Sequence, residues 1–452
     1  MDIARRSVLA ATILGSGMTF VDSTVVNVVL PVMGEQLHAT AAQLQWVVEA
    51  YMLLLTALVL LGGSLGDRYG RRRVFVLGTV LFAGASASCG LASGVVELII
   101  ARAVQGAGAA LLVPSSLSLI SATFDGHERG AAIGTWAAGT SIAAGAGPIL
   151  GSWLVERLSW RWVFLINLPL AAIVILIATL RMPESGGDDK AARQDWIGAA
   201  LAAAGLAALV FGLVRAGGGA SADRLSIGAI SLGAVMLTAF VWFEHHLDRD
   251  GQSHAMMPLR LFASPTFSGV NLLTLFLYAA LAIVMFVLPF TLIDRHHYSV
   301  VGAASSMLPF VVVMFALSHW AGTLVDRYGP RLPLIAGPLV AASGYLLMMR
   351  VSADGAYLTA VLPAVLAMST GMAISVAPLT TTVMAAVDAR HAGVASGINN
   401  AVARLASVLA VALVGLLASN GFATALGRAS GLAAALAVLG AICTALLVVR
   451  PR

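Results

Sequence analysis

Three charged side chains lie inside long apolar stretches of the sequence, namely Asp22, Glu49 and Arg102. A charge within the hydrocarbon of a bilayer is unfavourable unless it faces a polar cavity or an opposite charge. Two carboxylates beside one arginine cannot both ionise in such a place without a large penalty. We therefore expect one carboxylate to pair with Arg102 and the other to hold a proton, which is the minimum apparatus for coupling a process to proton movement.

The three charges lie at a similar depth if each apolar stretch is a membrane-spanning helix. At 1.5 Å per residue, Asp22 lies ~14 Å from the outer end of its helix, and Glu49 and Arg102 lie ~10 Å from theirs. We expect Asp22 to carry the coupling proton and Glu49 to tune it or to attract a cationic substrate. The alternative is that Glu49 points into a watery vestibule and has no role.

The elements that position these charges are membrane helices, because the composition excludes a water-soluble fold. The chain has 452 residues, of which 59% are apolar and 10% charged, whereas soluble proteins have about half and about a quarter. Two cysteines in apolar runs cannot form a disulfide framework. The net charge of +5 is attributed to basic loops, and we expect no nucleic-acid partner. The lipid bilayer is therefore the expected solvent.

Apolar runs between charged or Pro/Gly-containing breaks predict an all-α polytopic membrane protein with fourteen transmembrane helices. Arginines are more frequent in the connections on the side of the N-terminus, which predicts that both termini are cytoplasmic. The predicted spans are 8–31, 43–65, 74–93, 95–117, 131–153, 161–180, 196–215, 224–244, 266–290, 301–322, 332–350, 356–378, 393–417 and 430–449.

The chain contains an internal duplication. Residues 63–72, Gly-Ser-Leu-Gly-Asp-Arg-Tyr-Gly-Arg-Arg, are echoed by residues 322–331, Gly-Thr-Leu-Val-Asp-Arg-Tyr-Gly-Pro-Arg, and a weaker echo pairs Gly130 with Gly393. Parallel six-helix repeats are typical of secondary transporters, whose substrate site lies between the halves. The predicted domains are an N-terminal six-helix bundle at 1–195, two additional helices with a linker at 196–262, and a C-terminal six-helix bundle at 263–452.

The repeated loop resembles the cytoplasmic loop signature of the major facilitator superfamily. Its glycines permit a tight turn and a close approach of helices, and Asp67 lies where a neighbouring helix N terminus or an arginine could hold it. We expect a clasp that stabilises one conformation; the alternative is that the arginines only anchor the loop at the inner face. The expected gate residues are Gly63, Asp67, Arg68, Gly70, Arg71, Asp326 and Arg327.

Two further motifs resemble the same superfamily. The fourth predicted helix contains Leu-x-x-x-Arg-x-x-Gln-Gly-x-Gly at residues 98–108. The fifth resembles the antiporter motif of the exporting branches, although Ala143 and Ser152 replace two of its usual glycines. Small residues along one face allow a helix to pack closely or to slide against its partner, and tight packing alone is the alternative. The motif residues are Gly139, Gly147, Pro148 and Gly151.

Pieces of three predicted helices resemble one branch of this superfamily, the fourteen-helix drug:proton antiporters. They are 22–27 (Asp-Ser-Thr-Val-Val-Asn), 46–51 (Trp-Val-Val-Glu-Ala-Tyr) and 160–169 (Trp-Arg-Trp-Val-Phe-Leu-Ile-Asn-Leu-Pro). The resemblance implies the major facilitator fold, with two six-helix halves and two extra central helices. Arg404 is expected either to line the cavity between the halves or to brace a neighbouring helix. The candidate cavity residues are Asn27, Gln105, Asn399 and Arg404.

The function implied by the resemblance is secondary active transport, in which amphipathic small molecules or drugs are exported in exchange for protons by alternating access. It implies a multi-pass protein of the bacterial inner membrane that works as a monomer. Its partners would be a small amphipathic substrate, protons and the lipid bilayer. The proton gradient would supply the energy, without a cofactor or a metal.

Two alternatives remain open at the level of sequence. A dedicated exporter of one natural product, lipid or metabolite would use the same scaffold, because specificity depends on cavity side chains that no motif reports. A membrane-embedded enzyme would need a cluster of His, Asp or Cys in polar loops. The pairs His245-His246 and His296-His297 are the candidates for such a cluster, and a phosphate-binding Gly-x-x-x-x-Gly-Lys-Ser/Thr loop is absent from the sequence.

Overall fold

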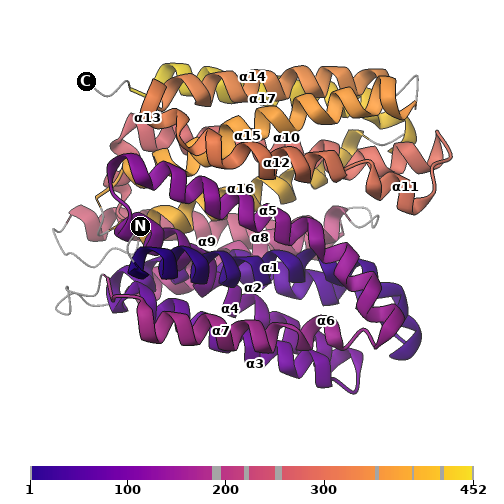
Figure 1. Cartoon of the computed structure of the whole chain (residues 1–452), viewed down its shortest axis with the longest axis horizontal. Helices are drawn as coiled ribbons and strands as arrows, with labels where there is room; N and C mark the ends of the chain where they lie inside the picture. The colour runs from indigo at the N-terminus through magenta and orange to yellow at the C-terminus, as the bar shows by residue number, and fades with distance from the viewer. Residues whose placement is uncertain are drawn as a thin grey trace.

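The computed structural model describes most of the chain, and every regular element in the described ranges is a helix. Long helices run side by side along the longest axis of the molecule (Figure 1). The start of α1 (Ile3–Gln36) and the end of α17 (Phe422–Leu447) lie at the same end, which we call the terminal end. The described residues are 3–185, 195–217, 223–249, 257–351, 356–388, 391–417 and 422–449.

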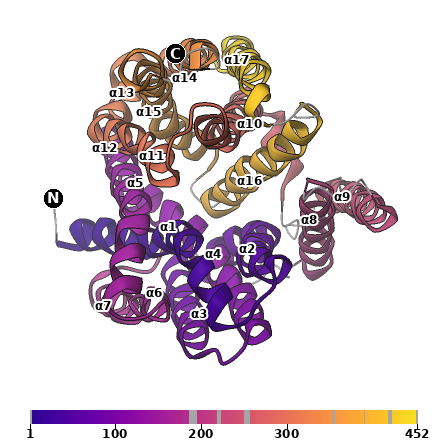
Figure 2. The same ribbon diagram turned by 90° about the vertical axis from the view of Figure 1, so that its right-hand side faces the viewer.

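The first seven helices form one group (Figure 2). The start of α2 is fixed by a capping box, in which the Thr40 hydroxyl accepts from the backbone N–H of Gln43 at 3.3 Å and the Gln43 side chain accepts from the backbone N–H of Thr40 at 2.9 Å. The remaining helices of this group are α2 (Ala41–Tyr69), α3 (Arg71–Leu91), α4 (Val95–Thr123), α5 (Gly126–Arg157), α6 (Trp162–Leu165) and α7 (Asn167–Arg181).

The helices from α10 onward form a second group, and α8 (Trp196–Gly217) and α9 (Arg224–Arg249) lie beside both groups (Figure 2). The inner helix of this pair, α8, packs against α2 and α16. The second group consists of α10 (Pro265–Asp294), α11 (Val300–Ser305), α12 (Leu308–Gly322), α13 (Leu324–Tyr328), α14 (Arg331–Val351), α15 (Leu362–Ala385), α16 (Ala392–Leu417) and α17, with the short turns η1 (Leu259–Ala263) and η2 (Tyr357–Val361).

Twelve helices in the described part of the chain are long and apolar enough to cross a membrane, so the prediction of fourteen is not supported by length and composition. The predicted span at 301–322 is interrupted after Ser305, because Pro309 lies in the first turn of α12 and cannot donate to a preceding turn. The remaining α12 is an apolar helix of 15 residues. The predicted span at 393–417 corresponds to α16, a helix of 26 residues that is not among these twelve.

Apolar side chains occupy both the interior and the outer surface. In the second group, α10 buries Leu273, Val284 and Leu288 completely. Leu91 and Leu446 are 75% and 78% exposed, and many other large apolar side chains also face outward. An apolar surface of this extent marks contact with a membrane rather than with water. The fold is therefore an all-helical bundle whose polar side chains must lie between the helices.

Candidate functional site

A cavity of about 840 Å³ lies between the two groups of helices. Its lining comes from α1, α2, α4 and α5 of the first group, from α10, α12, α15 and α16 of the second, and from α8. Ligand pockets are usually about 300–1,000 Å³, so the cavity has the capacity for a drug-sized molecule. Because it is built from both halves, its shape depends on how the halves are placed.

Aromatic side chains form much of the cavity wall. Trp46 of α2 stacks on Phe211 of α8, with ring centroids 5.7 Å apart and an interplanar angle of 29°. Phe20 of α1 meets Trp136 of α5 edge to face at 6.4 Å. Such rings give a large apolar contact area with few torsions to order. The extra helix α8 thus contributes directly to the cavity, although the sequence offered no motif for it.

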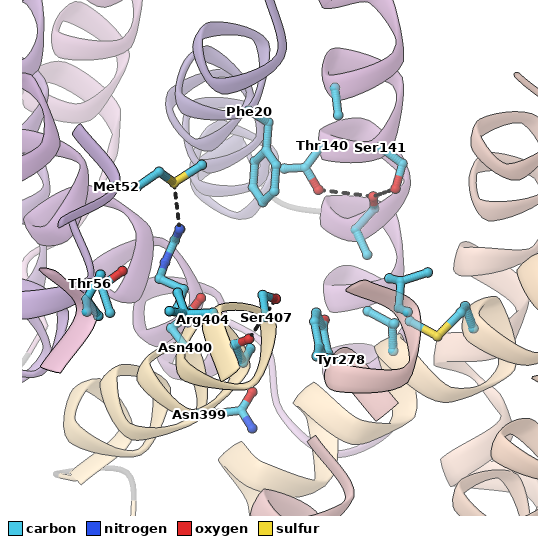
Figure 3. Close-up of a pocket in the computed structure, with 18 of the residues that line it drawn as sticks. Phe20, Met52, Thr56, Thr140, Ser141, Tyr278, Asn399, Asn400, Arg404 and Ser407 are labelled. Carbon is cyan, nitrogen blue, oxygen red and sulfur yellow. Dashed lines mark hydrogen bonds between the residues drawn. The ribbon is translucent and has the colours of Figure 1, made fainter. Parts of the chain in front are cut away.

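A few polar groups interrupt the apolar wall (Figure 3). The amide of Asn399 donates to the hydroxyl of Thr274 at 2.7 Å, and the amide of Asn400 donates to the carbonyl of Ser396 at 3.0 Å. Figure 3 shows Arg404 extending from α16 toward Met52 of α2, where Nη1 lies 3.7 Å from the thioether sulfur. The cavity therefore combines an apolar, aromatic surface with a guanidinium.

A second polar group is completely enclosed within the first half. Arg102 of α4 forms an ion pair with Asp22 of α1, and the side chains are 1% and 0% exposed. The Gln105 amide donates to Asp22 Oδ1 at 2.9 Å, and its oxygen accepts from Arg102 Nη1 at 2.7 Å. Arg102 Nε donates to the carbonyl of Val47 at 3.1 Å, and its guanidinium lies 4.3 Å from the ring centroid of Tyr51. These contacts offset the desolvation of the two charges.

The enclosed pair is connected to α3 and α7 by two residues that the sequence analysis did not select. Gln105 donates to the hydroxyl of Ser86 at 3.2 Å, and Asn167 donates to the same hydroxyl at 3.0 Å. Ser86 in turn donates to the carbonyl of Phe164 at 2.9 Å. Asn167 belongs to the segment 160–169, where a polar residue in an apolar run could have indicated a buried polar contact. Ser86 lies in a run of small residues, and nothing in the sequence distinguishes it from its neighbours.

Glu49 does not join this cluster, which corrects the expectation of a shared charge site. It is half-buried and lines the central cavity, whereas the ion pair of Arg102 is with Asp22. The physical reason is helical geometry. Val47 and Tyr51 both face Arg102, and a position between them at two residues from each is turned by about 200° around α2. Glu49 therefore lies at a similar depth to Arg102 but on the opposite side of α2.

The candidate cavity residues are distributed differently from expectation. Asn399 and Arg404 line the cavity. Gln105 does not, because it is completely buried between Arg102 and Asp22. The side chain of Asn27 lies outside the described residues. A glutamine three residues after Arg102 shares its helix face, so Gln105 follows the arginine into the enclosed cluster.

Asp67 joins the two halves at the terminal end. Its Oδ1 accepts from Nη2 of Arg71 at 2.9 Å and from Nε at 3.1 Å, and its Oδ2 accepts from the backbone N–H of Val394 at 2.9 Å. Val394 lies in the first turn of α16, where helix N–H groups have no partner within the helix. An arginine and a helix N terminus, the two partner types considered from the sequence, thus both contact this carboxylate.

Glycines bring the backbones of α2 and α16 into contact beside this aspartate. A Cβ on Gly63 would lie 2.1 Å from the carbonyl oxygen of Gly393, and a Cβ on Gly393 would lie 2.3 Å from that of Gly63. Gly70 has φ +101°, which favours glycine in the turn between α2 and α3. Arg68 is half-buried, with its guanidinium 5.5 Å from the ring centroid of Tyr69.

The second copy of the loop makes a matching glycine contact. A Cβ on Gly130 of α5 would lie 2.3 Å from the carbonyl oxygen of Gly322, which ends α12. The same point lies 3.7 Å from Asp326 Oδ2, so this carboxylate is beside the first turns of α5. Arg327 is exposed, and the turn is completed by Gly329 with φ +71°. Both copies therefore place an aspartate and a glycine against a helix of the other half.

The antiporter-like motif faces α1. A Cβ on Gly139 would lie 2.6 Å from Ile13, one on Gly147 would lie 2.1 Å from the hydroxyl of Thr24, and one on Gly151 would lie 2.6 Å from Val25. The Thr24 hydroxyl also donates to the carbonyl of Ala144 at 3.0 Å. The side chain of Pro148 lies outside the described residues. The glycine stripe thus fixes a close contact within the first half.

One histidine of each pair considered for an enzymatic site lies against a backbone carbonyl. A ring nitrogen of His246 lies 3.0 Å from the carbonyl oxygen of Trp242, and one of His296 lies 2.7 Å from that of Val351. In the described part of the chain, no group of three or more His, Cys, Asp or Glu side chains is arranged to hold a metal. The cavity is the better-formed site.

Two known proteins are similar to this chain in sequence over most of its length. The Multidrug resistance protein Stp of Mycobacterium tuberculosis (strain CDC 1551 / Oshkosh) is 34% identical over 412 residues, which cover 90% of this chain and 74% of Stp. The Tetracenomycin C resistance and export protein of Streptomyces glaucescens is 30% identical over 414 residues, which cover 91% of this chain and 76% of that protein.

A solved structure has the same fold. The proton:xylose symporter XylE, from E. coli, superposes with a TM-score of 0.72 at 17% sequence identity, over 99% of this chain and 96% of XylE. Family and fold point to a transporter rather than an enzyme, and the bacterial relatives support a multi-pass location in the bacterial inner membrane. Residues 12–411 match the family model of the Major Facilitator Superfamily, and the chain belongs to this family.

Proposed function

We propose that this transporter exports amphipathic small molecules, including drugs, in exchange for protons by alternating access. The observation that carries the proposal is the cavity of about 840 Å³ enclosed by both halves, with stacked aromatic rings in its wall. The name of one relative describes multidrug resistance. The name of the other describes resistance to tetracenomycin C and its export. A cavity of this size and character suits cargo of that kind.

The ion pair of Asp22 and Arg102 is the proposed proton site. Protonation of Asp22 would remove the charge that neutralises Arg102, so the contact between α1 and α4 would differ between the two protonation states. Two states with different contacts are the requirement for a proton to bias a conformational equilibrium. Glu49, in the cavity wall, would then modulate coupling through the substrate rather than through Arg102.

The finer topology is also part of the proposal. We infer that α12 and α16 cross the bilayer together with the twelve helices counted above, because each packs along a spanning helix of the other half, α5 and α2 respectively. This gives fourteen spans with both termini cytoplasmic, and places the Asp67 clasp at the cytoplasmic end. The domains would be 1–195, 196–262 and 263–452, in a protein that works as a monomer.

The test uses purified protein in proteoliposomes with an imposed proton gradient and a fluorescent amphipathic dye. We expect Asp22→Asn to abolish gradient-driven transport, because asparagine keeps the shape and the Gln105 contact but cannot bind and release a proton at this site. Dye exchange without a gradient should persist. Glu49→Gln is the control, with a shifted pH optimum only. Gradient-driven transport by Asp22→Asn at the wild-type rate would contradict the proton site.

A dedicated exporter of one natural product is the second candidate, and the name of the Streptomyces relative favours it. The two candidates differ in the number of ligands that bind the same cavity. Binding of many unrelated dyes and drugs to the purified protein would support a multidrug exporter. Tight binding of one compound class, with no binding of the others, would support the dedicated exporter.

A further inference from the structure

Arg404 has an unusual environment for a charge between membrane helices. Its Nε is buried and has no hydrogen-bond partner, and its Nη1 contacts the sulfur of Met52 at 3.7 Å. A thioether is a weak acceptor, whereas a guanidinium offers five N–H donors. Among the described residues, Arg404 forms no ion pair with a carboxylate. Most of its donors therefore lack a strong acceptor.

This arrangement contrasts with that of Arg102. Both arginines lie inside apolar helices, but Arg102 is surrounded by Asp22, Gln105 and the carbonyl of Val47. An arginine that only braces its neighbours would be expected to have such partners, because a buried charge without them is destabilising. Arg404 lacks them and lines the cavity. A ligand that brings an acceptor into the cavity would supply the missing contacts.

The side chains around this guanidinium determine which apolar groups a ligand can carry. Figure 3 shows Arg404 beside an open space bounded by Phe20 and Tyr278. The stacked pair of Trp46 and Phe211 completes the aromatic lining. Flat aromatic molecules bury a large area against such rings with little loss of torsional freedom. Among the described residues that line the cavity, Glu49 is the one with a carboxylate. It forms no ion pair with Arg404.

We propose that the cavity binds planar aromatic anions, whose carboxylate, sulfonate or phenolate accepts hydrogen bonds from Arg404 while the rings lie against the aromatic wall. The inference rests on the proposed function, since it names the cargo class of the same cavity. It replaces the expectation that Glu49 selects cationic substrates. A charge-assisted bidentate contact of this kind gives both binding strength and orientation.

The experiment compares two dyes that share the three-ring xanthene core, fluorescein, which is anionic at alkaline pH, and rhodamine 123, which is cationic. Binding is measured by fluorescence anisotropy with the purified protein in lipid nanodiscs, without a gradient. The wild type should bind fluorescein more tightly than rhodamine 123. Arg404→Gln should weaken fluorescein binding by roughly ten- to a hundredfold, as expected for hydrogen bonds to a charged group, and leave rhodamine 123 binding unchanged or tighter.

Two further variants separate charge from structure. Arg404→Lys keeps the charge and should retain part of the preference for fluorescein. Arg428→Gln removes the same charge from an exposed position on α17 and should leave both dyes unaffected. Equal weakening of both dyes by Arg404→Gln, or tighter binding of rhodamine 123 than of fluorescein by the wild type, would overturn the inference. The wild-type comparison decides it even where a variant fails to fold.

Failure of this inference and failure of the proposed function give different results. Because binding needs no proton gradient, a preference for fluorescein without any export would leave the inference intact and refute the exporter. Proton-driven export of rhodamine 123 without fluorescein binding would support the exporter and refute the inference.

Discussion

The two copies of the duplicated loop, residues 63–72 and 322–331, have nearly the same sequence but different contacts. In the first copy Asp67 is held by Arg71 and by the N–H of Val394. In the second copy Pro330 occupies the position equivalent to Arg71, so the loop itself supplies no guanidinium at that position. Both copies keep the glycine contact with the other half.

The difference separates two tasks of the loop. The glycines provide close backbone packing between the halves, and this part is duplicated. The charged clasp uses Arg71, which is 3% exposed and lies between α2 and α4. A single substitution, arginine for proline, therefore gives the first loop a guanidinium beside its aspartate that the second loop does not carry at the matching position.

The largest effect is expected from the shared glycines. Gly63→Val should reduce transport at least tenfold, because its Cβ would lie 2.1 Å from the carbonyl oxygen of Gly393 and force α2 away from α16. Gly322→Val should act similarly. Transport in proteoliposomes gives the rate, and single-molecule FRET across the terminal end gives the separation. The control is Gly84→Val, since a Cβ there meets nothing within 4 Å. Wild-type transport by Gly63→Val would show that the contact is dispensable.

A smaller effect, and a difference between copies, is expected from the aspartates. Asp67→Asn should shift the equilibrium away from the state with a closed terminal end by about two- to tenfold, because the amide loses the negative charge that Arg71 and the N–H of Val394 contact. Asp326→Asn should shift it less. Both proteins should insert and fold normally. Equal shifts in the same FRET measurement would remove the asymmetry between the copies.

The smallest effect is expected when the second loop receives the arginine that the first loop has at the matching position. Pro330→Arg offers Asp326 the partner that Asp67 has, and should favour the closed terminal end by about two- to fivefold, the range of a partly exposed ion pair. The gain should vanish in the double variant with Asp326→Asn. A gain that persists in the double variant would assign the effect to loss of the proline rather than to a new ion pair.

The sequence predicted well those features that depend on residue type and depth. The pairing of Arg102 with a carboxylate follows from the penalty for an unpaired charge, and Asp22 is its partner. The direction in which a side chain points around its helix axis does not follow from depth. Depth alone grouped Glu49 with these two residues, whereas the structure turns it into the cavity.

Helix ends and local breaks were also beyond the sequence pattern. An unbroken apolar run at 301–322 predicts one helix, but the structure has α11 and α12, separated at Ser306 and Met307. The contribution of Phe211 to the cavity depends on where α8 packs, which no motif in that helix indicated. Contacts between segments far apart in the chain are set by packing, and a hydrophobic pattern does not encode them.

The glycine crossings also limit the energy with which the halves hold together. Gly63 meets Gly393, and Gly130 meets Gly322, through backbone atoms without interlocking side chains. Smooth surfaces separate without the rotamer changes that interdigitated side chains require. Reversing a two-state population from 1:99 to 99:1 takes about 5.5 kcal/mol of differential binding. Glycine crossings at the terminal end thus lower the part of the opening work that falls on this region, which brings it closer to what one bound ligand and one proton can supply.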